Sequence, residues 1–308
     1  MALAGCAETR RPGGRAQRRE IPVVSVVRQQ GYTEDLYATV RRTLAGHHLD
    51  VRGKTVVLKP NLVEFEAGSV INTNPMLVHA ALEAFKAMGA ANVRIAEGPG
   101  HRRGTLDLAD AAGYFKTIPG FEELFTDLNL DDVSQIELAH PVSRLQSLYL
   151  PHTALSCDLL VSIPKMKTHH WAVATLSMKN LFGVVPGGVY GWPKNVLHWA
   201  GIAECITDIH RVFPRTFALV DGIVGMEGNG PIQGTAKAAG VIVAGKDLAA
   251  VDATCCRLMR IDPLHVEYLL LSRDSTELAQ AAIRQAGEPI ASLSTPFELL
   301  PQFRSARL

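Results

Sequence analysis

The alternation of short apolar runs with amphipathic stretches is the feature that most constrains the fold of this chain. Runs rich in Val and Ile are typical of central strands, and they occur at residues 22–27, 54–60, 92–98, 157–164, 216–222 and 240–245. Helical patterns lie between them, for example at residues 34–47, 75–90 and 195–213. Such alternation is typical of a parallel sheet covered by helices. The sequence therefore predicts an α/β fold with a mostly parallel sheet and helices on both faces.

The first 20 residues differ from the rest of the chain. They are rich in Arg, Gly and Ala and lack periodicity, which predicts a disordered basic arm before an α/β domain at residues 21–308, with a motif-bearing core at about 22–270. Within the arm, Leu3-Ala4-Gly5-Cys6 resembles a lipobox without the apolar segment that should precede it. Two interpretations stay open. The match is due to chance in a cytoplasmic protein, or it is the remnant of a lipoprotein signal whose true start lies upstream, in which case the protein is exported.

Charge and cysteine content exclude several classes of protein. The 31 basic and 30 acidic residues give a net charge of +1, so no global field attracts nucleic acid. No apolar run approaches the roughly 20 residues of a transmembrane helix. The five cysteines lack C-x-x-C spacing, which predicts no intrinsic iron–sulfur cluster and leaves redox chemistry dependent on an external redox partner. The oligomeric state is left open.

Polar residues follow several predicted strands, where ligands gather in such sheets. A shared site for a small anionic ligand is one interpretation, and lysines extended into water beside plain turns are the other. Because a lysine at a strand end carries little packing, Lys59→Ala and Lys165→Ala are expected to leave the fold intact. The candidate anion-binding residues are Lys59, Asn61, Lys165, Lys167, Asp221 and Glu227.

Lys179 and His198 lie in a second dense block. Apolar neighbours surround Lys179 in sequence, so its ammonium is either desolvated, with a lowered pKa and a capacity to act as nucleophile or base, or extended into water. Asn195 is predicted to cap a helix whose inward face includes His198. A neutral ring at that position binds a metal, or it is a hydrogen-bonded core residue.

Several motifs resemble the domain of unknown function 362 family, in the same order. They include "VVLKPNL", "IPKMKTH", "SMKNLFGVVPG", "VDGIVGMEGNGP" and "AVDATCCRLMRIDP". The resemblance implies an α/β fold without an established reaction. Many members carry a ferredoxin-type cysteine cluster or an export signal, and this chain departs from them in having no C-x-x-C-x-x-C run.

A more distant resemblance connects four residues with the lactate racemase family. "GPGHRR" supplies His101, "KTHH" supplies His169, "MKNLFGVVPG" supplies Lys179 and "NVLHW" supplies His198. The resemblance implies that His101 and His169 exchange a substrate proton, that Lys179 tethers a nickel-pincer nucleotide, and that His198 binds the metal. His170, beside His169, leaves that assignment ambiguous.

These patterns predict an enzyme, racemase- or isomerase-like or an oxidoreductase. It would act on a small anionic carboxylate compound by proton-transfer or redox chemistry at a metal- or anion-binding pocket. His101, His169 and Lys179 are the candidate catalytic residues, and His198 is the candidate metal ligand, with the cofactor otherwise open. The alternative is a non-catalytic protein that binds an anion or a metal, lipid-anchored if the signal interpretation holds.

Overall fold

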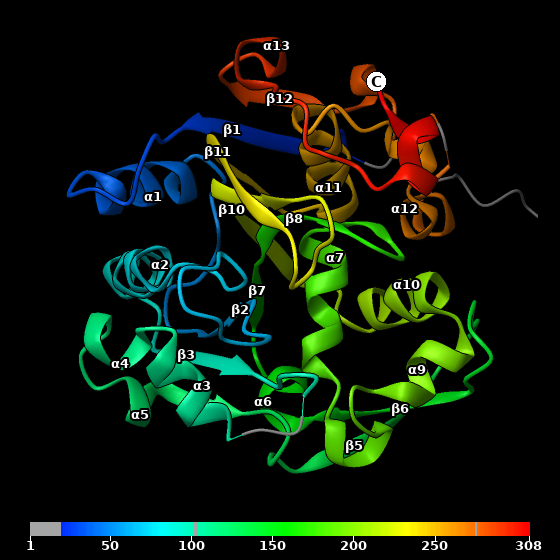
Figure 1. Ribbon diagram of the computed structural model, residues 1–308. Helices are drawn as coiled ribbons and strands as arrows, with labels where there is room; N and C mark the ends of the chain where they lie inside the picture. The colour runs from blue at the N-terminus through cyan, green and yellow to red at the C-terminus, as the bar shows by residue number, and fades with distance from the viewer. Residues whose placement is uncertain (1–19, 102–103, 275) are drawn as a thin grey trace, which may run out of the picture.

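The computed structural model describes residues 20–101, 104–274 and 276–308 (Figure 1). The basic arm and the lipobox-like Leu3–Cys6 segment lie outside the described residues, so those predictions stay open. Within the described ranges, every helix is too short or too polar to cross a lipid bilayer.

A ten-stranded sheet forms the centre of the molecule. Its strand order is β12-β1-β11-β10-β7-β2-β3-β4, with β8 beside β10 and β9 beside β8. Pairs β10–β7, β7–β2, β2–β3, β3–β4, β10–β8 and β1–β12 are parallel, whereas β1–β11, β10–β11 and β8–β9 are antiparallel. This arrangement confirms the predicted, mostly parallel α/β fold.

The strands of this sheet are β1 (Val23–Arg28), β2 (Thr55–Pro60), β3 (Asn92–Glu97), β4 (Phe125–Asp127), β7 (Leu159–Ile163), β8 (Lys165–His169), β9 (Val173–Thr175), β10 (Thr216–Glu227), β11 (Thr235–Gly245) and β12 (Arg284–Gly287). A separate antiparallel pair consists of β5 (Val133–Glu137) and β6 (Ser147–Pro151).

The longer α-helices are α1 (Leu36–Ala45), α2 (Pro75–Ala87), α3 (Thr105–Ala111), α9 (Asn195–Ala200), α10 (Ile202–Val212), α11 (Leu248–Leu258) and α12 (Glu267–Ser272). Single-turn helices are α4 (Tyr114–Thr117), α5 (Phe121–Leu124), α6 (His152–Leu155), α7 (Ser177–Asn180), α8 (Gly187–Tyr190) and α13 (Ile290–Leu293). Short 3₁₀ turns are η1 (Leu181–Val184), η2 (Pro263–His265), η3 (Gln280–Ala282) and η4 (Pro301–Ala306).

Helices cover both faces of the sheet, as the alternation of side chains along each strand requires. Val56 and Leu58 of β2 pack into one apolar core with α1 and α2, whereas Val57 packs into a second core with α10 and α11. In β10, Phe217 and Ala218 divide between the same two cores. Strands β2 and β10 therefore each contribute to both cores, because successive side chains point to opposite faces.

Two local predictions were wrong. The stretch after β7 is the buried strand β8 rather than a loop, because Pro164 interrupts the strand and the chain then pairs again with β10. The helix predicted from Asn195 onward is two helices, α9 and α10, separated by Gly201 at φ 109°, a conformation that suits glycine. Asn195 is the first residue of α9 and does not cap it.

A side-chain cap begins α2. The Asn74 side chain accepts a hydrogen bond from the Met76 N–H at 2.9 Å, and Pro75 is the first residue of α2. This arrangement is the favourable start of a helix that the sequence indicates.

Candidate functional site

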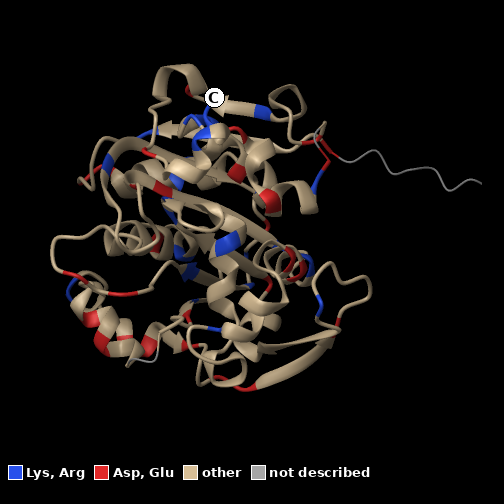
Figure 2. Cartoon of the chain, turned by 45° about the vertical axis from the view of Figure 1, so that its right-hand side comes forward, with Lys and Arg blue, Asp and Glu red and all other residues tan. Residues whose placement is uncertain are grey.

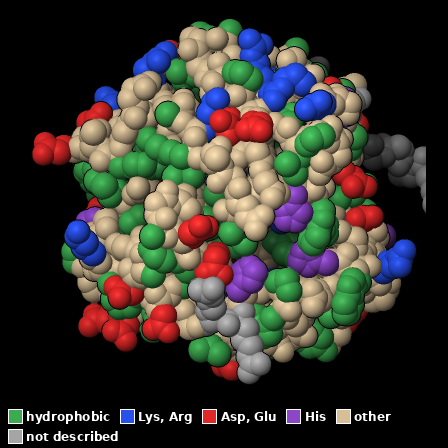
Figure 3. All heavy atoms as spheres, in the orientation of Figure 1, with side chains coloured by type: hydrophobic (Ala, Val, Ile, Leu, Met, Phe, Trp, Pro, Cys, Tyr) green, Lys and Arg blue, Asp and Glu red, His purple; other side chains and the backbone are tan. Residues whose placement is uncertain are grey.

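A cavity of about 410 Å³ lies where β2, β3 and β8 end. This is the sheet edge at which parallel strands present their loops to ligands. The structure brings seven of the predicted site residues to its wall: Lys59, Asn61, His101, Lys167, His169, Lys179 and His198. Histidine side chains surround a hollow on the face shown in Figure 3.

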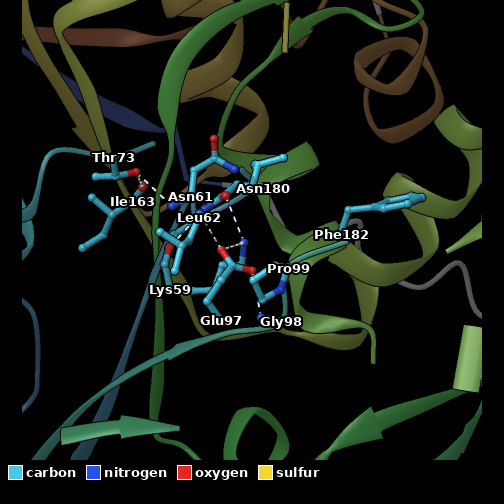
Figure 4. A network of polar contacts seen from close by, with 12 residues as sticks. Lys59, Asn61, Leu62, Thr73, Glu97, Gly98, Pro99, Ile163, Asn180 and Phe182 are labelled. Atoms are coloured by element: carbon cyan, nitrogen blue, oxygen red, sulfur yellow. Dashed lines mark hydrogen bonds and ion pairs between the residues drawn. The ribbon is translucent and has the colours of Figure 1, made fainter. Parts of the chain in front are cut away.

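Lys59 forms the charged floor of the cavity together with Glu97, the last residue of β3. The Lys59 ammonium lies 2.7 Å from a Glu97 carboxylate oxygen and donates to Asn180 Oδ1 at 3.0 Å. Glu97 also accepts hydrogen bonds from the backbone N–H groups of Leu62 and Gly98 (Figure 4). Burial lowers the pKa of Lys59, and the nearby carboxylate opposes that shift.

Gly183 allows this pair to form. A Cβ atom at Gly183 would collide with the Glu97 carboxylate and the Lys59 ammonium. The Gly183 carbonyl also accepts the Gly98 N–H at 3.0 Å. The turn η1 therefore comes close to the end of β3 because residue 183 has no side chain.

The expectation that Lys59 and Lys165 carry little packing was wrong. Lys59 is 1% exposed, and Lys165 is 2% exposed with its ammonium 2.7 Å from Asp221 Oδ2. Each lysine is buried in an ion pair, so truncation would leave a buried carboxylate without its partner.

Lys165, Asp221 and Glu227 do not line the cavity. Tyr32 donates to Asp221 Oδ1 at 2.7 Å, and Asp221 and Lys165 satisfy each other. Glu227 contacts Lys237 at 3.2 Å and accepts the Glu298 N–H, which ties the C-terminal segment to β10. These three residues therefore have partners within the fold and lie outside this cavity, whereas the sequence predicted them at the anion site.

Lys167 is buried without a carboxylate partner among the described residues. It is 0% exposed and donates to the carbonyl groups of Ile71 at 2.8 Å and Pro231 at 3.2 Å. Burial, followed by the charges of Lys165, Lys179 and Lys59, lowers its pKa well below the usual value. A bound anion would stabilise the ammonium form of Lys167.

Lys179 and His198 both lie close to the ring of Phe182. The Lys179 ammonium is 5.1 Å from the centre of the Phe182 ring, and the His198 ring is 5.5 Å from it. In the described part of the chain, this ammonium has no hydrogen-bond or ion-pair partner. Burial, together with Lys59, lowers the pKa of Lys179 to about 8. It is therefore the cationic group most available to a ligand.

Lys194 is a site residue that the sequence interpretation missed. It is 2% exposed and donates to the carbonyl groups of Gly98 at 2.7 Å and Phe182 at 2.9 Å. Burial lowers its pKa to about 7. No sequence motif marks this lysine, because its position depends on a left-handed backbone (φ 66°) before α9.

Asp252 is a buried carboxylate outside the cavity lining. It lies in α11, is fully buried, and accepts the N–H groups of Ser177 at 2.8 Å and Met178 at 3.0 Å. Burial raises its pKa to about 7. Asp252 thereby holds the start of α7, the turn that carries Lys179.

Two buried oxygen atoms at the cavity wall lack hydrogen-bond partners within residues 20–101, 104–274 and 276–308. They are Asn61 Oδ1 and Thr175 Oγ1. Most buried polar atoms are satisfied in folded proteins, so these two atoms are candidates to contact a ligand. In the described ranges, no three His, Cys, Asp or Glu residues are grouped as a metal site.

The lining charges are strongly asymmetric. Four lysines face the cavity with one carboxylate, Glu97, among the lining residues that the structure describes. Figure 2 shows that positions of both charge types occur within the fold as well as at its edges. The fold and the site thus define an α/β protein with a lysine-rich cavity at the edge of its sheet.

A family model described as "Domain of unknown function (DUF362)" matches residues 56–257, which is more than half of the chain. This protein therefore belongs to the DUF362 family, which confirms the resemblance found in its motifs. A relative, the thylakoid-associated protein sll1697 of Synechocystis sp., is 28% identical over 256 residues, covering 78% of this chain and 75% of the relative.

Two solved structures are similar at low identity. The lactate racemase apoprotein from Thermoanaerobacterium thermosaccharolyticum has a TM-score of 0.49 and 16% identity, with coverage of 77% of this chain and 57% of that chain. A protein from Thermotoga maritima has a TM-score of 0.40 and 11% identity, with coverage of 74% and 59%. This chain thus spans less than two thirds of either protein, and these likenesses leave its activity undefined.

Proposed function

We propose that this protein is an enzyme that binds a small anionic compound, such as a carboxylate, in the lysine-rich cavity and acts on it by proton transfer or redox chemistry. The observation that supports this proposal is the excess of lysines over carboxylates at the cavity wall. Lys167 has only carbonyl partners, and Lys179 has none among the described residues. Burying such cations is unfavourable unless an anion compensates them.

Lysine and histidine side chains at the cavity wall support proton transfer as well as anion binding. Lys179 and Lys194, with pKa values of about 8 and about 7, can exchange protons near neutral pH. His101, His169 and His198 line the same cavity. A bound anion would therefore lie beside both cationic and proton-transferring groups.

Anion titration by calorimetry tests the binding step. Inorganic phosphate and a series of small mono- and dicarboxylates would be titrated into the wild-type protein, Lys179→Met and the control Lys86→Met. Lys86 lies on the exposed side of α2 and pairs only with Glu83. Since a hydrogen bond to a charged group contributes about 1.5–3 kcal/mol, Lys179→Met should weaken binding by about tenfold or more. Equal affinities of all three proteins would contradict the proposal.

Deuterium exchange separates the enzyme from the binding-protein alternative. Each anion that binds would be incubated with the protein in heavy water and examined by NMR for exchange of its carbon-bound hydrogens. Exchange that requires Lys179 would support proton transfer. Tight binding without exchange, and without electron transfer to redox dyes, would favour the non-catalytic alternative.

A nickel-pincer nucleotide is the second candidate for this cavity. Lys179 has no competing hydrogen-bond or ion-pair partner among the described residues, and both Lys179 and His198 lie close to Phe182 and line the same cavity, so the residues that would tether the cofactor and bind its metal face one space. When bound, such a group would supply a hydride acceptor. Mass spectrometry of protein from its native host should then show an adduct on Lys179, and metal analysis should show nickel that His198→Ala loses.

A further inference from the structure

Three histidines at the cavity wall differ in the backbone group that contacts Nδ1: N–H groups for His169, and a carbonyl oxygen for His170 and for His198. The rings of His169 and His170 stack at a centroid distance of 4.7 Å and an interplanar angle of 19°. Trp171 contacts His170 at 4.6 Å and His198 at 5.6 Å. All four rings line the cavity, and their backbone partners determine which nitrogen atoms remain for a ligand.

His169 uses Nδ1 as an acceptor. The backbone N–H groups of Trp171 and Ala172 donate to this nitrogen at 3.0 Å and 3.1 Å. A neutral ring with an acceptor at Nδ1 carries its hydrogen on Nε2. Protonation of Nδ1 would break both bonds, so the remaining polar atom of His169 is a hydrogen-bond donor.

His170 and His198 are arranged the opposite way. His170 Nδ1 lies 2.8 Å from the Gly230 carbonyl oxygen, and His198 Nδ1 lies 3.0 Å from the Lys194 carbonyl oxygen. Because a carbonyl oxygen only accepts, each Nδ1 must carry the hydrogen. Nε2 then retains its lone pair, as it does in histidines that act as bases or bind metals.

We propose that His170 is the proton acceptor of this site and that His169, stacked against it, is the hydrogen-bond donor that positions the ligand. This inference rests on the proposed anion site and assigns its ligand class: an anion that also carries an O–H group. The two stacked rings line one cavity and leave a donor on His169 and an acceptor on His170, which matches a ligand that carries both an oxyanion oxygen and a hydroxyl group.

The proton transfer is balanced without a further reactant. The lone pair of His170 Nε2 forms a bond to the hydroxyl proton, and the electron pair of the O–H bond remains on the ligand oxygen. The resulting imidazolium keeps its Nδ1–H bond to the Gly230 carbonyl. Lys167 and Lys179, which line the same cavity, stabilise the negative charge on the ligand.

Nitrogen NMR of histidine-labelled protein tests the assignment without any ligand. Two-bond nitrogen–hydrogen correlations distinguish a protonated ring nitrogen from one with a lone pair, and His169→Gln and His170→Gln would assign the signals. We expect the lone pair on Nδ1 of His169 and on Nε2 of His170 and His198. A proton on Nε2 of His170 in the ligand-free protein would overturn the proposal.

Chemical modification provides a second readout on the wild-type chain. Diethyl pyrocarbonate acylates the unprotonated ring nitrogen, so peptide mass spectrometry should find His170 modified well before the buried His169, and inorganic phosphate should slow modification of His170 but not of the exposed control His265. Faster modification of His169 than of His170 would also overturn the proposal. If phosphate gives no protection while the tautomers are as assigned, the anion site fails and the histidine assignment stands.

Discussion

Lys165 and Lys167 lie two residues apart on β8, and both are almost completely buried. Lys165 contacts Asp221 and Tyr32, so its charge is compensated within the fold. Among the described residues, Lys167 contacts only the carbonyl groups of Ile71 and Pro231. The two lysines are thus similarly buried and differ in whether a carboxylate compensates the charge. We propose that this difference separates the structural role of Lys165 from a ligand-binding role of Lys167.

The largest expected effect on stability comes from removing the charge of Asp221, the carboxylate partner of Lys165. Asp221→Asn leaves the buried Lys165 ammonium without its counter-charge, and loss of one partner of a buried ion pair costs about 3–5 kcal/mol. We therefore expect a decrease of about that size in the free energy of unfolding, measured with urea. A change below about 1 kcal/mol would mean that this pair behaves like an exposed one.

Substitution of Lys167, which lacks a carboxylate partner among the described residues, should change stability little and weaken anion binding. Lys167→Met removes a buried cation that has no carboxylate partner among the described residues, so the substitution leaves no unpaired buried charge behind. The free energy of unfolding should change by no more than about 1 kcal/mol, whereas phosphate affinity should fall by about tenfold or more because a charged hydrogen bond is lost. Strong destabilisation with unchanged affinity would place Lys167 in the same structural class as Lys165.

The pH dependence of anion binding tests whether lysines without a carboxylate partner gain charge when an anion binds. The pKa values of Lys179 and Lys194 are lowered to about 8 and about 7, and a bound anion would raise them by favouring the charged forms. Anion binding should therefore take up protons, with affinity greatest below pH 7 and falling above pH 8 by up to about tenfold per pH unit for each linked proton.

Calorimetry in buffers of different ionisation enthalpy measures this uptake. Lys194→Met should reduce the number of protons taken up, whereas Lys86→Met should not. Affinity that stays constant from pH 7 to pH 9 would show that the lysines are already fully charged in the free protein.

The sequence indicated the sheet well because its information is local. Apolar runs at a strand period and helical stretches between them identify the elements, and the rule that parallel strands present ligands at their carboxyl ends located the cavity. That rule is also why residues as distant in sequence as Lys59 and His198 were assigned to one site.

Other features of the site depend on contacts that local sequence does not encode. The Lys165–Asp221 pair joins positions 56 residues apart, so both appeared to be free polar groups at strand ends. Lys194 lines the cavity and has a left-handed backbone itself, between Pro193 and α9. No sequence motif predicted that conformation. The opposite hydrogen bonding of His169 and His170 depends on Gly230, which lies in the turn between β10 and β11.

The smallest expected effect on stability comes from substitution of Asn74. This uncharged residue contacts the Lys165–Asp221 ion pair. Its side chain caps α2, and its backbone N–H donates to Asp221 Oδ2 at 3.0 Å. Asn74→Ala removes the cap and keeps the backbone donor, so unfolding should become easier by about 1 kcal/mol, as for other lost caps. Phosphate affinity should not change. A loss of affinity matching that of Lys167→Met would show that the two sides of the comparison are coupled through α2, and the distinction between structural and ligand-binding lysines would then no longer hold.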